Sequence, residues 1–202
     1  MADRGKEGFR VSEQALMLRR KLAEARPHAY KPMLANSLIN HAGRLMEAEQ
    51  PEEGLLASQE AVDLSRELAE SDPEPYLPNL AVALNNHAIW LAESGRDDEA
   101  LASSQEALNL RRQLVKQNRD ANLHGYAQSL VSIGWILSRM RRWSEMVSPL
   151  IEAITLNRDL PEYNRTTLAE TLLLSAHTES SEEIDQAVEA ITGRTFGQWI
   201  SE

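Results

Sequence analysis

The feature that most constrains this chain is an internal repeat with a period of 46 residues. When the segment from Tyr76 to Leu114 is moved back by 46 positions, Tyr76 lies over Tyr30 and Pro78 over Pro32. The match continues into the second half without an insertion, because SSQEALNLRRQL lies over ASQEAVDLSREL in the same register. Such a repeat indicates one supersecondary unit that is copied along the chain and buries its apolar face by stacking on its neighbours.

Each copy of the repeat divides into two amphipathic helices. Apolar and small residues recur at spacings of three and four in the second half, from Ala100 to Leu114. Pro32 and Pro78 are expected in the first turn of a helix, and Gly95 just after the end of one. We therefore predict an all-α chain, with helices near residues 12–25, 31–48, 52–71, 77–94, 98–117, 123–140, 144–159 and 164–177 and shorter ones after 180.

The repeat also predicts how the chain is organised. We expect an α-α superhelix of about three helical hairpins with half-repeats at its ends. Ser12 is the expected N-cap of the first helix, and Pro149 is expected to kink or delay the second helix of the third repeat. The predicted segments are a flexible lead at 1–10 and a single domain at 11–202, built from a half repeat (11–25), three repeats (30–71, 76–117 and 122–160) and a degenerate repeat with a C-terminal cap (162–202).

At this point the residues resemble the tetratricopeptide repeat (TPR) family. Leu84, Ala88, Ala100 and Ala107 fall on the spacing of its signature, and small residues there let two helices approach closely. The string LNNHA followed by GRDDEAL resembles the longer repeats of kinesin light chain and of bacterial signalling proteins. The resemblance implies a TPR-like solenoid whose first helices build a concave surface that binds proteins.

Composition excludes several classes of function. Lys and Arg number 21 against 31 Asp and Glu, and the net charge of -10 disfavours nucleic acid and anionic membranes as partners. No apolar run approaches the roughly 20 residues that span a bilayer. The chain contains no cysteine, so neither a disulfide nor a thiolate site can form, and a cytoplasmic location is expected.

The sequence offers no catalytic motif, and we expect neither an enzyme nor a bound cofactor. His41 and His87 occupy the same position in successive repeats. Equivalent side chains on stacked helices lie roughly 8 to 10 Å apart, too far for two nitrogens that share one zinc ion. We therefore expect no metal site. The alternative is that each histidine fills a leucine position and bonds to a neighbouring helix.

The candidate binding surface is one face of the first helix of each repeat. Positions spaced by 4, 3 and 4 residues share that face, and stacking would align amides that donate to and accept from a peptide backbone. The alternative, that Asn40 and Asn86 only bond between neighbouring helices, stays open. Glu47 and Glu93 predict a partner segment that is basic near the first repeat. The predicted peptide-binding groove comprises Asn36, Asn40, Glu47, Val82, Asn86, Ile89, Glu93, Gln128, Ser132, Trp135 and Arg139.

These observations predict an interaction scaffold or adaptor that binds a peptide or protein segment in the groove. Two alternatives stay open, a self-associating structural module and a sensor or effector arm of a larger signalling protein. The helix at 12–25 lacks a first helix of its own, so the stripe of Ala15, Leu18 and Leu22 needs cover. We expect a second copy to provide it, in a weak homodimer through this N-terminal helix.

Overall fold

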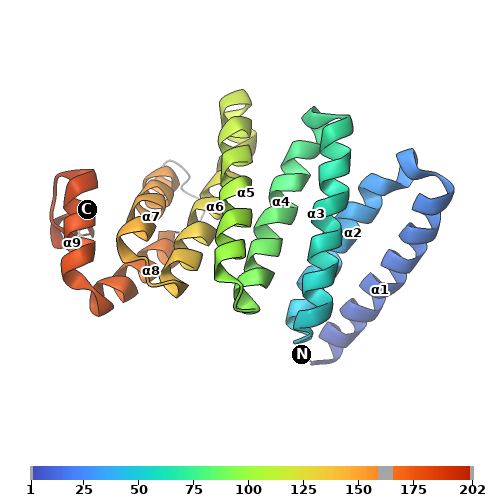
Figure 1. Cartoon of the computed structure of the whole chain (residues 1–202), viewed down its shortest axis with the longest axis horizontal. Coiled ribbons are helices and arrows are strands. Elements are labelled where there is room, and N and C mark those ends of the chain that lie inside the picture. The colour runs from blue at the N-terminus through green and yellow to red at the C-terminus, as the bar shows by residue number, and fades with distance from the viewer. Residues whose placement is uncertain (1, 159–165, 201–202) are drawn as a thin grey trace. The chain divides into compact units, whose positions relative to one another are not determined.

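The computed structural model describes residues 2–158 and 166–200 and is all-α in that part of the chain (Figure 1). The chain forms two compact units, Met1–Leu110 and Arg111–Glu202, which divide within the fifth helix. The helices of the described residues are α1 (Ala2–Ala25), α2 (Pro27–Glu47), α3 (Pro51–Ser71), α4 (Pro73–Glu93), α5 (Asp97–Gln117), α6 (Arg119–Arg139), α7 (Trp143–Arg158), α8 (Thr166–Glu179), α9 (Ser181–Thr192) and α10 (Phe196–Ile200).

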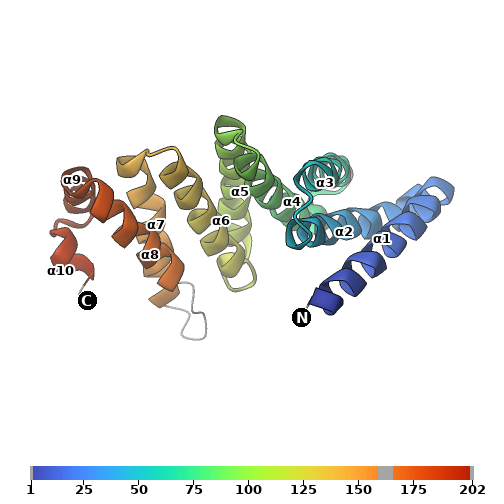
Figure 2. The same ribbon diagram turned by 90° about the horizontal axis from the view of Figure 1, so that it is seen from below.

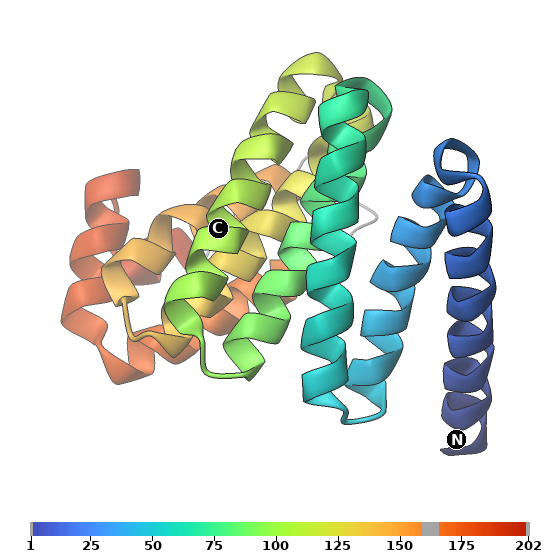
Figure 3. The same cartoon turned by 45° about the vertical axis from the view of Figure 1, so that its right-hand side comes forward.

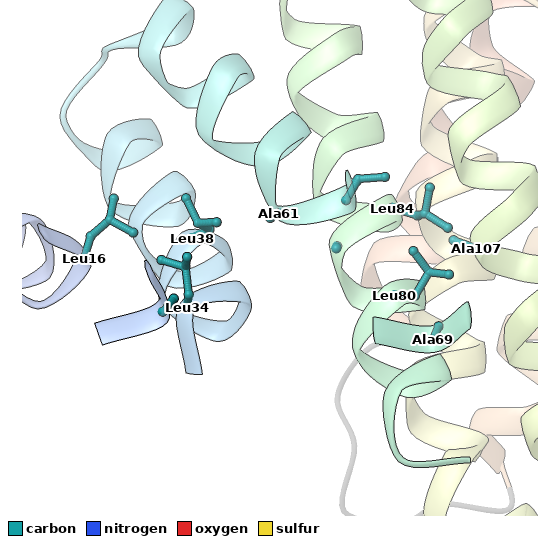
Figure 4. Packing of buried hydrophobic residues seen from close by; sticks show 11 residues of the cluster. Leu16, Leu34, Leu38, Ala61, Ala69, Leu80, Leu84 and Ala107 are labelled. Carbon is teal, nitrogen blue, oxygen red and sulfur yellow. The ribbon is translucent and has the colours of Figure 1, made fainter. Parts of the chain in front are cut away.

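The first unit stacks α1 to α4 and the first part of α5 in antiparallel order. Neighbouring helices in this order pack side by side, as α1, α2, α3 and α4 do in Figure 3. Leu16 of α1 lies toward Leu34 and Leu38 of α2, and Leu84 of α4 packs near Ala107 of α5 (Figure 4). Ala88, Ala100 and Ala107 are 0% exposed, as expected for small residues that let two helices approach closely.

The second unit continues the same order with α6 to α10. Helix α6 packs on α7 and α8, and α9 packs on α7 and α8 as well. A Cβ added at Gly134 of α6 would lie 2.4 Å from a methyl carbon of Leu150 of α7, so the glycine allows the close contact between these two helices. Phe196 and Trp199 of α10 are buried at the end of the unit, as a terminal cap requires. Within the described residues, no helix is long and apolar enough to cross a membrane.

The first helix begins earlier than the sequence analysis predicts. Helix α1 starts at Ala2, so residues 2–10, which we expected to be a flexible lead, are helical. Ser12 therefore lies inside the helix and is not its N-cap. Ala, Arg, Lys and Glu in this stretch are good helix formers, and they outweigh Gly5 and Gly8, which cost about 1 kcal/mol each.

The first helices of the repeats also begin four residues earlier than predicted. Pro27 and Pro73, which are themselves 46 residues apart, take the first helical position, whereas Pro32 and Pro78 lie inside α2 and α4. Both prolines of each pair satisfy the rule that proline suits the first turn of a helix, so the rule alone cannot decide between them. The sequence analysis chose the later proline, whereas the helix begins at the earlier one. The expected delay at Pro149 is also wrong, because α7 begins at Trp143 and continues through the proline.

A ladder of ion pairs follows the same period and joins the second helices of neighbouring repeats. Arg20 of α1 pairs with Glu60 of α3, and Arg66 of α3 binds Glu106 of α5 through two hydrogen bonds of 2.6 and 3.1 Å. Within the second unit, a nitrogen of Arg112 lies 3.9 Å from an oxygen of Glu152. Each pair is largely exposed and is worth at most about 1 kcal/mol. The ladder therefore follows the repeat but adds little to stability.

Candidate functional site

The first unit contains a pocket with a volume of about 860 Å3. Its walls come from α1, α2 and α4. Helices α1 and α2 leave their shared loop and spread apart toward the start of α1 (Figure 2). The residues that line the pocket are Gly8, Val11, Ser12, Ala15 and Arg19 of α1, Ser37, Ile39, Asn40, Gly43 and Arg44 of α2, and Asn86 of α4.

Two of the predicted groove residues meet at this pocket. Asn40 and Asn86 both line it, one from α2 and the other from α4. Asn40 is exposed and Asn86 is half-buried. Neither amide forms a hydrogen bond with another part of the described chain. Two unpartnered amides on one concave wall can donate to and accept from a ligand backbone.

The described pocket lining does not include four other predicted residues of the first unit, Asn36, Val82, Ile89 and Glu93. Asn36 is exposed, and its Oδ1 accepts a hydrogen bond of 3.2 Å from Nδ2 of Asn79. Val82 and Ile89 are half-buried and Glu93 is exposed. The side chain of Glu47 lies outside the described residues.

The described lining of the pocket contains two basic side chains, Arg19 and Arg44, and no carboxylate. Our expectation of a partner segment that is basic near the first repeat rests on Glu47 and Glu93, neither of which belongs to this described lining, and it stays a prediction for the surface that carries them. Arg19 donates through Nη1 to Oγ of Ser37, which holds its guanidinium at the interface of α1 and α2.

The remaining predicted residues belong to α6 of the second unit. Gln128, Ser132 and Trp135 are half-buried, and Arg139 is exposed. The Cζ atom of Arg139 lies 5.1 Å from the centroid of the Trp135 ring, which is a cation–π contact. Trp135 is thus an aromatic side chain that is partly accessible on α6 and in contact with a cation.

The two histidines are part of the scaffold. Nδ1 of His41 lies 3.1 Å from Oγ of Ser12, and Nδ1 of His87 lies 2.9 Å from Oγ of Ser58. Both rings are buried, and this burial lowers the pKa of each histidine, so that both are neutral at pH 7. The expected bond to a neighbouring helix is confirmed. Among residues 2–158 and 166–200, no group of three or more His, Cys, Asp or Glu could hold a metal ion.

Sequence reasoning missed the contribution of α1 to the pocket. Gly8 and Arg44 correspond by the 46-residue period to Gly54 and Trp90 of the next hairpin. The Trp90 ring is 3% exposed and fills the space beside Gly54, whereas Arg44 is exposed and comes within 3.9 Å of a Cβ added at Gly8. Extending the repeat alignment back to residue 8 would have shown that the first hairpin lacks this buried ring.

The stacked antiparallel hairpins and the residues in their interfaces define a TPR-like helical repeat fold. The chain is similar to a solved structure, that of BtubC (BKLC) from P. vanneervenii, with a TM-score of 0.64 and 15% sequence identity. The similarity covers 94% of this chain and 74% of that one. At this identity it shows the fold alone. No protein-family model matches the sequence, and no curated protein matches it either.

Proposed function

We propose that this chain is a non-catalytic interaction module, which binds a segment of a protein partner at the pocket of its first unit. The observation that carries the proposal is the pair of amides of Asn40 and Asn86, which line one pocket without hydrogen-bond partners in the described chain. An unpartnered amide in a concave wall suits the donors and acceptors of a peptide backbone. Arg19 and Arg44 favour a segment with carboxylates.

The test compares stability and binding in the variant in which Asn40 and Asn86 are both changed to alanine. Its urea midpoint should stay near that of the wild type, because neither amide bonds within the fold. A displayed library of random linear peptides, selected on the wild type, supplies the ligands. Affinity for these ligands should fall by about 0.5 to 1.5 kcal/mol for each lost neutral hydrogen bond.

The matched control is Asn109→Ala, which removes an exposed amide of α5 that does not line the pocket and whose one hydrogen bond, of 3.3 Å, comes from the exposed Gln105 of the same helix. It should leave peptide affinity unchanged and stability nearly so, because an exposed side-chain pair on one helix is worth only about 0.2 to 0.5 kcal/mol. If the double variant binds the selected peptides as well as the wild type does, or if it loses substantial stability, the asparagines are scaffold and the proposal fails.

In the second unit, we propose Trp135 as an anchor for the partner. The ring is half-buried and contacts Arg139, and aromatic residues often dominate interfaces. The same observation would also fit an aromatic ring that only packs on its own helix. Trp135→Ala, tested with the same selected peptides, separates these alternatives: peptide affinity should fall if Trp135 is an anchor and should stay unchanged if it is not.

Self-association is a second candidate function, since α1 carries exposed apolar side chains. Val11 is 56% exposed, Met17 53% and Leu18 59%. The expected weak homodimer through this helix would cover them, and it stays a prediction.

A further inference from the structure

Helix α1 has an open face where the equivalent helices of the other repeats are covered. By the 46-residue period, Val11 corresponds to Ala57 of α3 and to Ser103 of α5. Ala57 is 8% exposed and belongs to one cluster with Ala42 and Leu45 of α2 and Trp90 of α4. Ser103 donates a hydrogen bond of 3.0 Å to the Leu84 carbonyl of α4. This position therefore contacts the helix that precedes it in its own hairpin, and in α3 it also lies near the helix that follows. In α1 the same position is 56% exposed.

The neighbouring positions of α1 show the same contrast. Leu18 corresponds to Leu64, which is partly buried against the core, yet Leu18 is 59% exposed. The stripe through Val11, Leu18 and Leu22 of α1 thus corresponds to Ala57, Leu64 and Leu68 of α3, which pack into the core of the first unit. In the part of the chain described by the structure, nothing occupies the corresponding place beside α1.

The pocket includes Val11 of this open face and is bounded by α2 on its other side. Ile39 and Gly43 of α2 line it, and their counterparts, Asn85 and Ile89, lie on α4, a helix that packs against α2. A Cβ added at Gly43 would meet no atom within 4 Å. The pocket therefore presents the two surfaces that a preceding helix would touch, one on α1 and the other on α2.

We propose that this pocket is a docking slot for an amphipathic α-helix of a partner protein, which would pack there as α2 packs on α3. The inference rests on the proposed function, because it uses the same pocket. The bound helix would carry leucine and alanine on one face, at the spacing that Leu84, Ala88 and Leu91 have in α4.

The charges of the slot define the direction and the chemistry of this helix. A helix antiparallel to α1 ends near Gly8 and Arg44, so its negative dipole end would face a guanidinium. Carboxylates in its last turn add to this attraction. The expected partner segment is therefore an acidic amphipathic helix with its C-terminal end at Arg44.

A second copy of this chain is a poorer occupant. The first helices of the repeats are packed within their own units, where Leu38 of α2 is 0%, Leu84 of α4 2% and Leu130 of α6 0% exposed. Helix α1 of a second copy would bring the exposed Arg10 and Lys21 toward Arg19 and Arg44 of the pocket. Like charges oppose that contact, whereas an acidic partner helix has no such cost.

The test uses a labelled synthetic peptide with the sequence of α4, residues 73–93, which has the required apolar face and ends in Glu93. Full-length protein is titrated into the peptide, and binding is followed by fluorescence anisotropy and by the helical circular dichroism signal. We expect saturable binding to one site with a gain of helix. A peptide with the same composition in scrambled order should not bind.

Two variants locate the binding in the slot. Gly43→Leu fills space in which no atom lies within 4 Å, so the protein should stay folded, and the affinity for the peptide should fall at least about tenfold. Leu18→Glu should weaken binding similarly. The matched control is Leu56→Glu on α3, a 72% exposed leucine outside the pocket lining, which should leave the affinity unchanged.

The outcomes separate this inference from the proposed function. If the α4 peptide does not bind, or binds Gly43→Leu as tightly as the wild type, the helix slot is wrong; the proposed function then still stands if displayed peptides depend on Asn40 and Asn86. If the peptide binds through Gly43 but displayed peptides ignore both asparagines, the slot holds and the amide site fails. A protein that is already dimeric at the assay concentration, with the slot closed by its second copy, would also overturn the choice of a partner helix.

Discussion

At the scale of single residues, the end of each first helix shows how the repeat tolerates unfavourable side chains. Glu49, Gly95 and Arg141 occupy the same position in three repeats, and their φ angles are 55°, 73° and 55°. The next amide bonds to the carbonyl five residues earlier in each case, at 3.0 Å, 2.9 Å and 3.0 Å. The turn therefore requires a left-handed residue, and only Gly95 adopts that conformation without a steric cost.

Replacing Glu49 by glycine should stabilise the first unit. A left-handed conformation costs a residue with a side chain about 1 to 2 kcal/mol, and glycine avoids this cost. Part of the resulting gain in stability is offset, because glycine loses more entropy on folding. We expect a net gain of about 0.5 to 1 kcal/mol in the urea unfolding free energy. Glu49→Ala is the control, since it removes the charge but keeps the Cβ. An equal gain from Glu49→Ala would show that charge, and not backbone conformation, is responsible.

Gly54 shows the opposite case, in which a glycine is required by packing. A Cβ at Gly54 would lie 2.3 Å from Cη2 of the buried Trp90 ring. Gly54→Ala should therefore destabilise the protein. Overpacking costs about 1 to 3 kcal/mol, whereas the higher helix propensity of alanine stabilises the helix by only about 1 kcal/mol.

The control for this prediction is Gly43→Ala, at a helical glycine with open space around it. It should raise the thermal midpoint, because the propensity gain has no steric cost there. If both substitutions stabilise, the Trp90 ring moves aside easily and the close contact does not constrain the sequence.

At the scale of helix pairs, the serine–histidine contacts couple stability to pH. Oγ of Ser58 also donates to the Leu55 carbonyl at 2.9 Å, so its single hydrogen is used and Nδ1 of His87 must be the donor in their shared bond. Protonation would place a second N–H and a charge in the same buried site. Burial lowers the pKa of His87, with a further contribution from Arg96, against the opposing effect of Asp63 and Glu99.

The sign of the pH dependence follows from this lowered pKa. Below about pH 6.5 the unfolded chain binds a proton at His87 that the folded chain does not, so the unfolding free energy should fall as the pH decreases. The slope for one such histidine is at most about 1.4 kcal/mol per pH unit. His87→Leu should reduce the slope of urea unfolding free energy between pH 6.5 and 5. An unchanged slope would mean that His87 titrates normally in the fold.

Much of the fold could be predicted from the sequence because the same helical pattern recurs with a period of 46 residues. The second helix of repeat two was predicted at 98–117 and spans Asp97–Gln117. What could not be predicted depends on contacts between different copies. The guanidinium of the buried Arg111 packs on Gly125, where a Cβ would lie 2.4 Å from Nη1, and no period reveals that pairing. The pocket likewise depends on how far α1 and α2 spread apart, which amphipathic patterns do not determine.

At the scale of the whole molecule, the exposed stripe of α1 predicts weak self-association. Val11 and Leu18 favour contact with a second α1, whereas Arg10 and Lys21 of the second copy oppose it. The net charge of -10 adds repulsion between copies. In sedimentation equilibrium, the average mass should therefore exceed the 22.7 kDa of one chain only at the highest concentrations.

Salt and one substitution identify the forces behind this association. Added salt screens repulsion between like charges and should strengthen the dimer, because the attraction is apolar. Leu18→Glu should abolish it, and Leu56→Glu, at an exposed leucine of α3, should not. The α4 peptide should also dissociate the dimer if both use the open face of α1. A mass that stays at one chain under all these conditions would mean that the stripe is not self-complementary, so that its cover must come from a different protein.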